Sequence, residues 1–322
     1  MSFSGAIKKV IQFELSGILG VVILICLLLG FVTHGFFSRY NLESISLTIA
    51  IAIIVGLSQL SVLAIGNFNL ALGPMGALGG VCAGVLMQVY HAPVLIAVLA
   101  GLILGILAGA FQGYLIVKTG INPFIITLAL ASVYLGGITA LTEAEFYHGL
   151  PKVFNDLGSA TYLGIPVLLI IAVVTAYILW AVFSHLPIGR QLLSIGASQK
   201  AAYFSGIPTD NVIIIAHAMS GFCAALAGIL LVARLNSASI DIPADWMLAS
   251  FAGPVLGGTL ISGGKLSITG TIIGAILMTI INNGLILMGV STYWYQSFLG
   301  AILLGAFALD RVRLAYIVRQ KL

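Results

Sequence analysis

Long apolar runs fill most of the chain, and short segments rich in polar residues, glycine or proline separate them. A helix that crosses the roughly 30 Å hydrocarbon core of a bilayer needs about 20 apolar residues. The pattern therefore predicts an all-α, polytopic transmembrane bundle of about ten spans, some of them broken. The predicted spans cover residues 17–37, 44–64, 68–90, 93–116, 122–142, 163–185, 211–234, 246–262, 266–289 and 292–309.

Two of these predicted spans have boundaries with more than one interpretation. Residues 66–69 mark either a loop or a break inside one membrane segment. The first apolar stretch, 17–32, follows a short basic segment and lacks a small-x-small cleavage site. It is therefore expected to be an uncleaved span.

The composition favours a membrane location. Hydrophobic residues make up 61% of the chain and charged residues 7%, with a mean hydropathy of +1.19, whereas soluble domains have roughly 25% charged residues. Residues 1–322 are expected to form a single membrane domain. The three cysteines lie in apolar spans and the five histidines are scattered singly, so the sequence predicts neither a metal site nor a cofactor.

The distribution of basic residues predicts the orientation. With the N-terminus in the cytoplasm, ten basic residues fall on the cytoplasmic side and three on the outer side, which follows the positive-inside rule. Both termini and the segment 186–211 are then cytoplasmic. The net charge of +4 follows from this topology and implies no nucleic-acid partner. The basic residues are Lys8, Lys9, Lys118, Arg190, Lys200, Lys265, Arg311, Arg313, Arg319 and Lys321 inside, and Arg39, Lys152 and Arg234 outside.

Glycine recurs every four residues in two spans, at 101–113 and 76–84. Small residues let helices approach closely in lipid, so these rows indicate tight packing or, alternatively, surfaces that slide during transport. Two further segments, 66–76 and 253–264, combine glycine and proline and resemble the broken helices that line transport paths.

Polar side chains inside the spans are few and uncharged, which disfavours a proton-driven carrier and suits a neutral polyol or sugar. Each of these residues either contacts solute or joins helices by hydrogen bonds. The residues are Gln59, Gln112, Thr127, Asn282 and Asn283.

The chain lacks a phosphate-binding loop for ATP. Leu266 follows Gly264-Lys265, and Thr259 stands where the motif needs its first glycine. Catalytic motifs are also missing, so the chain is not expected to be an enzyme.

The segment 186–211 is longer than a simple connection between two spans requires. Ser198 can cap a short helix that continues to Ser205, with Gly206 just past its end. Pro187 and Pro208 bracket the segment. A helix of about two turns is marginal alone in water, so it docks either on its own bundle or on a partner.

Several segments together carry a family resemblance. In the cytoplasmic segment they are Gly189-Arg190, Ile195-Gly196, Ala201-Ala202 and Ser205-Gly206-Ile207. Elsewhere they are Asn69–Gly73, Pro123-Phe124-Ile125, Leu226-Ala227-Gly228, Val255-Leu256-Gly257-Gly258-Thr259, Gly263-Gly264, Ser267, Gly270-Thr271, Gly274-Ala275, Asn282-Asn283-Gly284-Leu285 and Gly289-Val290. Over residues 45–310 the chain resembles the ribose-type permeases of ABC importers, which carry ribose, other monosaccharides and autoinducer-2.

Three positions depart from the family pattern. Asn69-Leu70-Ala71-Leu72-Gly73 stands where the family has Asp-Leu-Ser-Val-Gly, which removes a carboxylate and a hydroxyl from the usual substrate assignment. Gln199-Lys200 replaces an acidic position before the Ala-Ala pair, and Leu266 replaces a glycine. These departures are compatible with a chain that pairs with a different permease in one transporter.

The resemblance implies a multi-pass permease of the bacterial inner membrane. Its implied partners are cytoplasmic ABC ATPase subunits, a second permease in a homo- or heterodimer, a periplasmic substrate-binding protein and the lipid bilayer. The expected solute is a sugar or sugar-like neutral molecule. A secondary carrier for a neutral solute is the alternative.

Ten residues are the candidates for these roles. Those expected near the substrate path are Asn67, Phe68, Asn69, Asn282 and Asn283. Those expected to couple to the ATPase are Arg190, Gly196, Ala201, Ala202 and Gly206.

Overall fold

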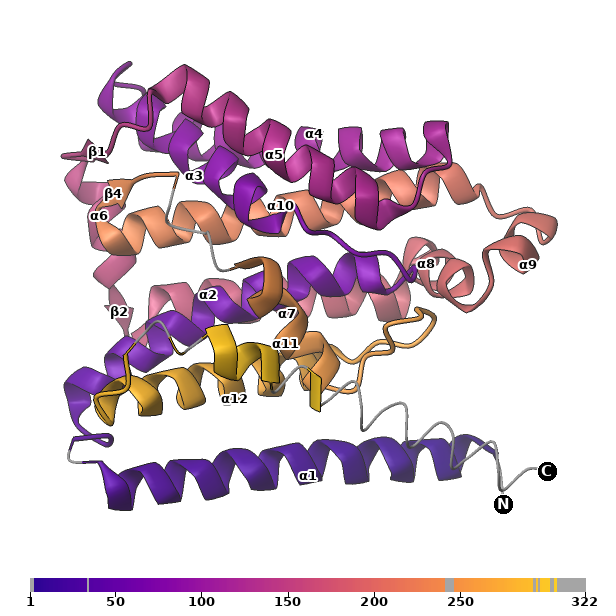
Figure 1. Ribbon diagram of the computed structural model, residues 1–322, viewed down its shortest axis with the longest axis horizontal. Coiled ribbons are helices and arrows are strands. Elements are labelled where there is room, and N and C mark those ends of the chain that lie inside the picture. The colour runs from indigo at the N-terminus through magenta and orange to yellow at the C-terminus, as the bar shows by residue number, and fades with distance from the viewer. Residues whose placement is uncertain are drawn as a thin grey trace.

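The computed structural model describes residues 3–33, 35–240, 246–291, 294, 296–301 and 304–305, with side-chain environments from residue 17 onward. These residues form a bundle of helices with two short antiparallel strand pairs, β1–β4 and β2–β3 (Figure 1). The helices are α1 Phe3–Val32, α2 Arg39–Leu63, α3 Leu72–Gln88, α4 Val94–Thr119, α5 Pro123–Thr142, α6 Lys152–Ser159, α7 Val167–His185, α8 Pro187–Ala197, α9 Gln199–Phe204, α10 Thr209–Leu235, α11 Trp246–Leu256 and α12 Ile268–Leu287. The strands are β1 Tyr147–His148, β2 Thr161–Tyr162, β3 Ile165–Pro166 and β4 Ser237–Ala238.

The helices confirm the predicted multi-pass, all-α class. Within the described residues, six helices (α2, α4, α5, α7, α10 and α12) are long and apolar enough to cross a membrane. Three shorter apolar stretches lie at Gly17–Val32, Leu72–Gln88 and Trp246–Leu256. Half of the last predicted span, 292–309, lies outside the described residues.

Two predicted spans are shorter in the structure because glycine changes the backbone direction. α11 ends at Leu256 rather than at residue 262, since Gly258 adopts a φ of 79°. α7 begins at Val167 rather than at 163, because Leu163 and Gly164 form the turn between β2 and β3. Positive φ of this kind suits glycine and ends regular helix.

Two further boundaries are resolved. Residues 64–71 are not helical, so the segment around Gly66 is a loop that separates α2 from α3. Pro187 does not leave an irregular segment after α7. It occupies the first turn of the eleven-residue helix α8, where its missing N–H costs no hydrogen bond.

α10 lies at the centre of the bundle and packs against α4, α3 and α2 (Figure 1). The α4 glycine row faces it. A Cβ on Gly105 would overlap the carbonyl of Gly221, and one on Gly109 would overlap the carbonyl of His217. The row is therefore a packing surface on which two backbones touch, as expected for helices joined by small residues in lipid.

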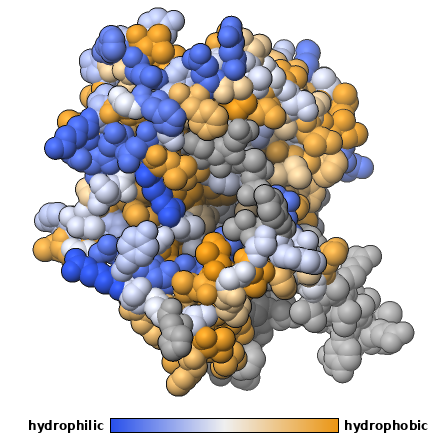
Figure 2. Space-filling view, turned by 60° about the vertical axis from the view of Figure 1, so that its left-hand side comes forward, coloured by the Kyte–Doolittle hydropathy of each residue, from blue (hydrophilic) through white to orange (hydrophobic). Residues whose placement is uncertain are grey.

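The two ends of the bundle carry different elements. α8, α9 and the N-terminal end of α1 lie at the right of Figure 1, whereas β1, β4, α6 and β2 lie at the left. Figure 2 turns the left-hand end toward the viewer and shows hydrophilic residues around a hollow between the upper and lower parts of the bundle. The hollow and the α8–α9 pair are thus at opposite ends of the molecule.

Candidate functional site

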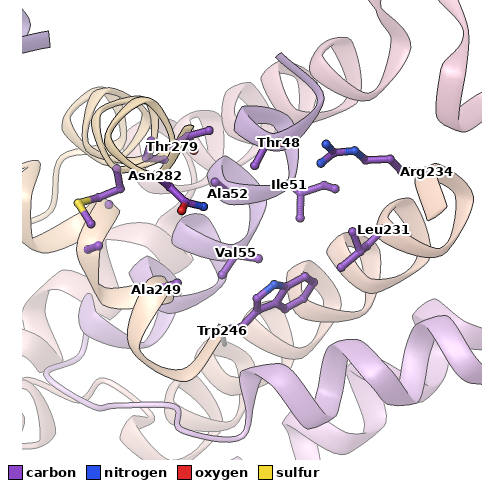
Figure 3. A pocket seen from close by; sticks show the side chains of 14 residues that line it. Thr48, Ile51, Ala52, Val55, Leu231, Arg234, Trp246, Ala249, Thr279 and Asn282 are labelled. Carbon is purple, nitrogen blue, oxygen red and sulfur yellow. Dashed lines mark hydrogen bonds between the residues drawn. The ribbon is translucent and has the colours of Figure 1, made fainter. Parts of the chain in front are cut away.

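A cavity of about 190 Å³ lies between α2, α10, α11 and α12 (Figure 3). Its wall is mostly aliphatic, with Ile51, Val55 and Leu231 among its apolar residues. The polar and aromatic residues of the wall are Thr48, Arg234, Trp246, Thr279 and Asn282. A concave apolar site with a few converging polar groups is the usual form of a small-molecule site.

Arg234 brings a positive charge to the cavity from the last turn of α10. Its Nη2 donates to the carbonyl oxygen of Ser44 at 3.5 Å, and no carboxylate pairs with it among the residues that the structure describes. In Figure 3 its side chain extends toward Thr48 and Ile51. Within the described residues, most of its five N–H donors are therefore left for oxygen atoms that enter the cavity.

The two threonines and the amide of the wall offer neutral groups. Thr48 Oγ1 donates to the carbonyl of Ser44, and Thr279 Oγ1 donates to the carbonyl of Ala275, both at 2.9 Å. Each hydroxyl keeps lone pairs that can accept from a solute. Asn282 adds an amide with both a donor and an acceptor.

The five predicted path residues do not meet at one place. Asn282 lies in the cavity wall. Asn283 instead pairs with Asn41, its Nδ2 donating to Asn41 Oδ1 at 2.8 Å. Phe68 packs against Phe251, with ring centroids 5.8 Å apart.

Asn69 and Asn67 anchor the loop between α2 and α3 to α10. Asn69 is fully buried, and its Nδ2 donates to Ser220 Oγ at 2.9 Å. Asn67 Nδ2 lies 3.3 Å from His217 Nε2. The structure therefore gives these two amides hydrogen-bond partners within the bundle.

His217 is one of five histidines scattered singly along the chain, and no sequence motif marks it. It is fully buried in α10, with Gln112 Nε2 2.8 Å from its Nδ1 and Asn67 on its other nitrogen. A neutral imidazole donates at one nitrogen and accepts at the other. The buried Gln112 Oε1 has no hydrogen-bond partner within the described residues. A half-turn of that amide would let this oxygen accept from His217 Nδ1–H while Asn67 Nδ2 donates to Nε2.

The segment 186–211 folds as predicted into a capped short helix and adds a longer one before it. Ser198 Oγ accepts from the backbone N–H of Ala201 at 3.3 Å, and α9 then runs from Gln199 to Phe204. Gly206 follows with a φ of 81°. Tyr203 is 66% exposed and Phe204 is 85% exposed, so the tip of the segment presents aromatic rings outward.

The predicted coupling residues divide between two faces. Arg190, Ala201 and Gly206 are exposed. Ala202 is buried, and Gly196 faces the bundle. The segment thus has one surface that contacts the protein itself and one that is open at the end of the molecule.

Gly196 belongs to a junction where three backbone segments touch. A Cβ at Gly196 would overlap the carbonyl oxygen of Ala64, which caps α2, and the backbone nitrogen of Gly264. The N–H of Gly264 donates to that same Ala64 oxygen at 3.1 Å. A Cβ at Gly66 would lie 2.8 Å from the carbonyl oxygen of Ser262. The end of α8, the end of α2 and the loop after α11 therefore meet here, and we refer to Gly196, Ala64, Gly66 and Gly264 as the glycine junction.

The chain is similar to transport permeases. A profile of the family described as branched-chain amino acid transport system / permease component matches residues 41–307. The D-allose transport system permease protein AlsC of Escherichia coli is 31% identical over 277 residues, which are 86% of this chain and 85% of that protein.

Two further relatives are similar over most of their length. The ribose import permease protein RbsC of Bacillus subtilis is 33% identical over 315 residues, covering 97% of this chain and 96% of that protein. The autoinducer 2 import system permease protein LsrD of Salmonella typhimurium is 32% identical over 257 residues, which are 78% of this chain and 77% of that protein. No solved structure matches the chain.

Proposed function

Because the chain belongs to the family of branched-chain amino acid transport system permease components, we propose that it imports a sugar or sugar-like neutral solute as one permease subunit of an ABC importer. The family consists of transport permease components, so the chain is a transport subunit rather than an enzyme. Its source of energy in this proposal is a separate cytoplasmic ATPase.

The observation that carries the proposal is the α8–α9 segment. It combines an inner face packed on the glycine junction with an exposed face that bears Ala201, Gly206 and two aromatic rings. An ATPase that gripped the exposed face would move α8, and α8 is in backbone contact with the end of α2. Arg190, Gly196, Ala201, Ala202 and Gly206 remain the proposed coupling residues.

The choice of a sugar over an amino acid is supported by two features. The relatives named above are described by allose, ribose and autoinducer 2 transport, and they align with most of this chain. The described wall of the cavity offers hydroxyl, amide and guanidinium groups and no carboxylate that would pair with an α-ammonium group. Both features favour an oxygen-rich solute over one that carries an α-ammonium group.

The proposed topology has about ten spans, with both termini in the cytoplasm. It is supported by the placement of the N-terminal end of α1 at the same end of the bundle as α8 and α9 (Figure 1). The proposed location is a bacterial inner membrane. A periplasmic binding protein would deliver solute to the opposite end, where the cavity lies.

A second permease subunit, identical or different, completes the proposed transporter. The proposed substrate-path residues are Asn282 in the cavity wall and, beyond it, Asn67, Phe68, Asn69 and Asn283. The Asn69 segment and Gln199-Lys200 depart from the family pattern, which suits a pair of unlike permeases.

The proposal is tested by mild purification from native membranes followed by reconstitution. We expect an ABC ATPase to co-purify with the chain, and proteoliposomes that contain the complex and its binding protein to take up labelled monosaccharides only when ATP is present. Uptake that survives ATP depletion and collapses with the ion gradient would establish the secondary carrier instead.

A further inference from the structure

The cavity between α2, α10, α11 and α12 has the chemistry of a site that holds one solute molecule. We infer that it binds a single monosaccharide-sized polyol during import, with Arg234 and Asn282 contacting solute oxygens and Trp246 contacting an apolar face of the ring. The inference rests on the proposed import function and adds the residues and the order in which they act.

Arg234 supplies the strongest argument for an oxygen-rich ligand. A guanidinium group has donors and no acceptor, and a partly buried charge without a hydrogen-bond partner is costly. Arg234 has one weak contact to a backbone carbonyl, and no carboxylate pairs with it among the described residues. Hydroxyl oxygens of a solute would accept from the N–H groups that have no partner among the described residues.

Trp246 supplies an apolar face at a fixed position. It is 9% exposed and lines the cavity. A Cβ at Gly76 of α3 would lie 2.6 Å from Trp246 Cζ3, so the missing side chain of Gly76 makes room for the indole ring. The ring is thereby held against α3. In Figure 3 it lies below Thr48 and Ile51, with Asn282 at one flank of the cavity and Arg234 at the other.

The cavity ends at a closed floor. One residue beyond Val55 on α2, a Cβ at Gly56 would lie 3.1 Å from Thr271 Cγ2 and 3.6 Å from Pro254 Cδ. α2, α11 and α12 therefore close around this level, and Pro254 lies inside the last turn of α11 at the same place. The structure thus has a cavity at the end opposite α8–α9 and a barrier beneath it.

Gln59 lies below this floor and is the next polar group along the path. The residues of α2 that line the cavity include Thr48, Ala52 and Val55. Because helix positions three or four apart share a face, Gln59 continues that face one turn further. It is fully buried, and neither its Nε2 nor its Oε1 has a hydrogen-bond partner within the described part of the chain.

An unpaired buried amide destabilises a folded protein, so Gln59 points to a role in another state. We assign it to the step in which α2, α11 and α12 separate at Gly56 and the solute moves from the cavity toward α8–α9. Its amide then replaces the hydrogen bonds that the solute gives up at Arg234 and Asn282.

The assembled transporter in proteoliposomes tests the inference, with a panel of labelled pentoses and hexoses that includes D-ribose and D-allose. Arg234→Gln and Asn282→Ala are each expected to raise KM about tenfold, equivalent to the loss of one good contact. Arg39→Gln is the matched control, because Arg39 is exposed at the start of α2 and pairs only with Glu43 within the described residues. It should keep the KM of the natural chain.

Gln59→Leu has a different expected signature. It should leave KM unchanged and lower the maximal uptake rate about tenfold, while the midpoint of thermal unfolding stays the same or rises. A role for Gln59 in the fold alone predicts the opposite: an unchanged rate and a lower midpoint.

A labelling measurement covers the case in which Arg234→Gln does not insert. In a chain whose three cysteines are replaced, Asn282→Cys should react with a small thiol reagent, and the transported sugar should protect it. KM values within about twofold of the natural chain for both cavity variants, or labelling that saturating sugar leaves unchanged, overturn the site. Absence of ATP-driven uptake of every sugar by the natural complex overturns the import function, and the inference with it.

Discussion

The two ends of the bundle are built in opposite ways. At the cavity end, side chains from four helices surround empty space, and a guanidinium group there lacks a carboxylate partner among the described residues. At the glycine junction, three backbone segments touch so closely that a single Cβ at Gly196 would overlap two of them. The cavity can therefore change its volume, whereas the three segments of the glycine junction can move only together.

α2 connects these two regions. Thr48 lines the cavity, and Ala64 caps the same helix at the glycine junction, 16 residues later. That separation is about 24 Å at 1.5 Å per residue. A displacement of α8 is therefore expected to reach the cavity wall through a single, largely buried helix.

The largest expected effect comes from blocking the exposed face of the α8–α9 segment. Ala201→Asp places a carboxylate on the surface proposed to meet the ATPase, and it should abolish ATP-driven uptake. Membrane insertion should be unaffected, because Ala201 is exposed. Uptake and co-purification of the ATPase are the measurements, and normal values for both would show that this face is not the contact.

Gly196→Ala tests the junction without touching that surface. Its Cβ would overlap backbone atoms at Ala64 and Gly264, and overpacking of this kind costs about 1–3 kcal/mol or shifts the segments apart. We expect uptake to fall at least about tenfold while the ATPase still binds and hydrolyses ATP.

Gly137→Ala in α5 is the matched control for Gly196→Ala, because nothing lies within 4 Å of a Cβ at Gly137. It should transport like the natural chain. Equal uptake by the two variants would mean that the junction transmits no motion. A loss of ATPase binding in Gly196→Ala would move the residue to the docking surface.

The two ends also differ in how far the sequence predicts them. The α8–α9 segment is contiguous, and its cap at Ser198 and its stop at Gly206 are local signals that the structure confirms. The cavity joins Thr48, Arg234 and Asn282, which are far apart in the chain. Only helix packing decides that these side chains meet, so the sequence predicts Asn282 as one of five path residues and uses Arg234 only to orient the chain.

His217 shows the same limit in the core between the two ends. Its partner Asn67 comes from the loop after α2, and its partner Gln112 comes from α4. No rule of sequence spacing connects these residues. His217→Ala leaves the buried amide of Gln112 and the half-buried amide of Asn67 without this partner, which should lower the free energy of unfolding by about 1–3 kcal/mol. Thermal unfolding in detergent measures this loss.

His185→Ala is the comparison for that measurement, because His185 is exposed at the end of α7. It should change the unfolding midpoint little. Equal midpoints for the two variants would mean that the buried set around His217 contributes no net stability, so that the loop after α2 is held by Asn69 and Ser220 instead.

The smallest expected effect comes from the Ser198 cap of α9, at the exposed end of the bundle. Ser198→Ala removes the side chain that caps α9, which costs about 1 kcal/mol of helix stability. Because a six-residue helix is marginal in water, its formation is then coupled to docking, and the affinity for the ATPase should fall about fivefold. Titration of the ATPase onto the permease in nanodiscs measures the change. Ser194→Ala is the control, because Ser194 lies on the exposed side of α8, and this variant should bind the ATPase like the natural chain. An unchanged affinity for Ser198→Ala would show that the packing of Ala202 against the bundle already holds α9 in place.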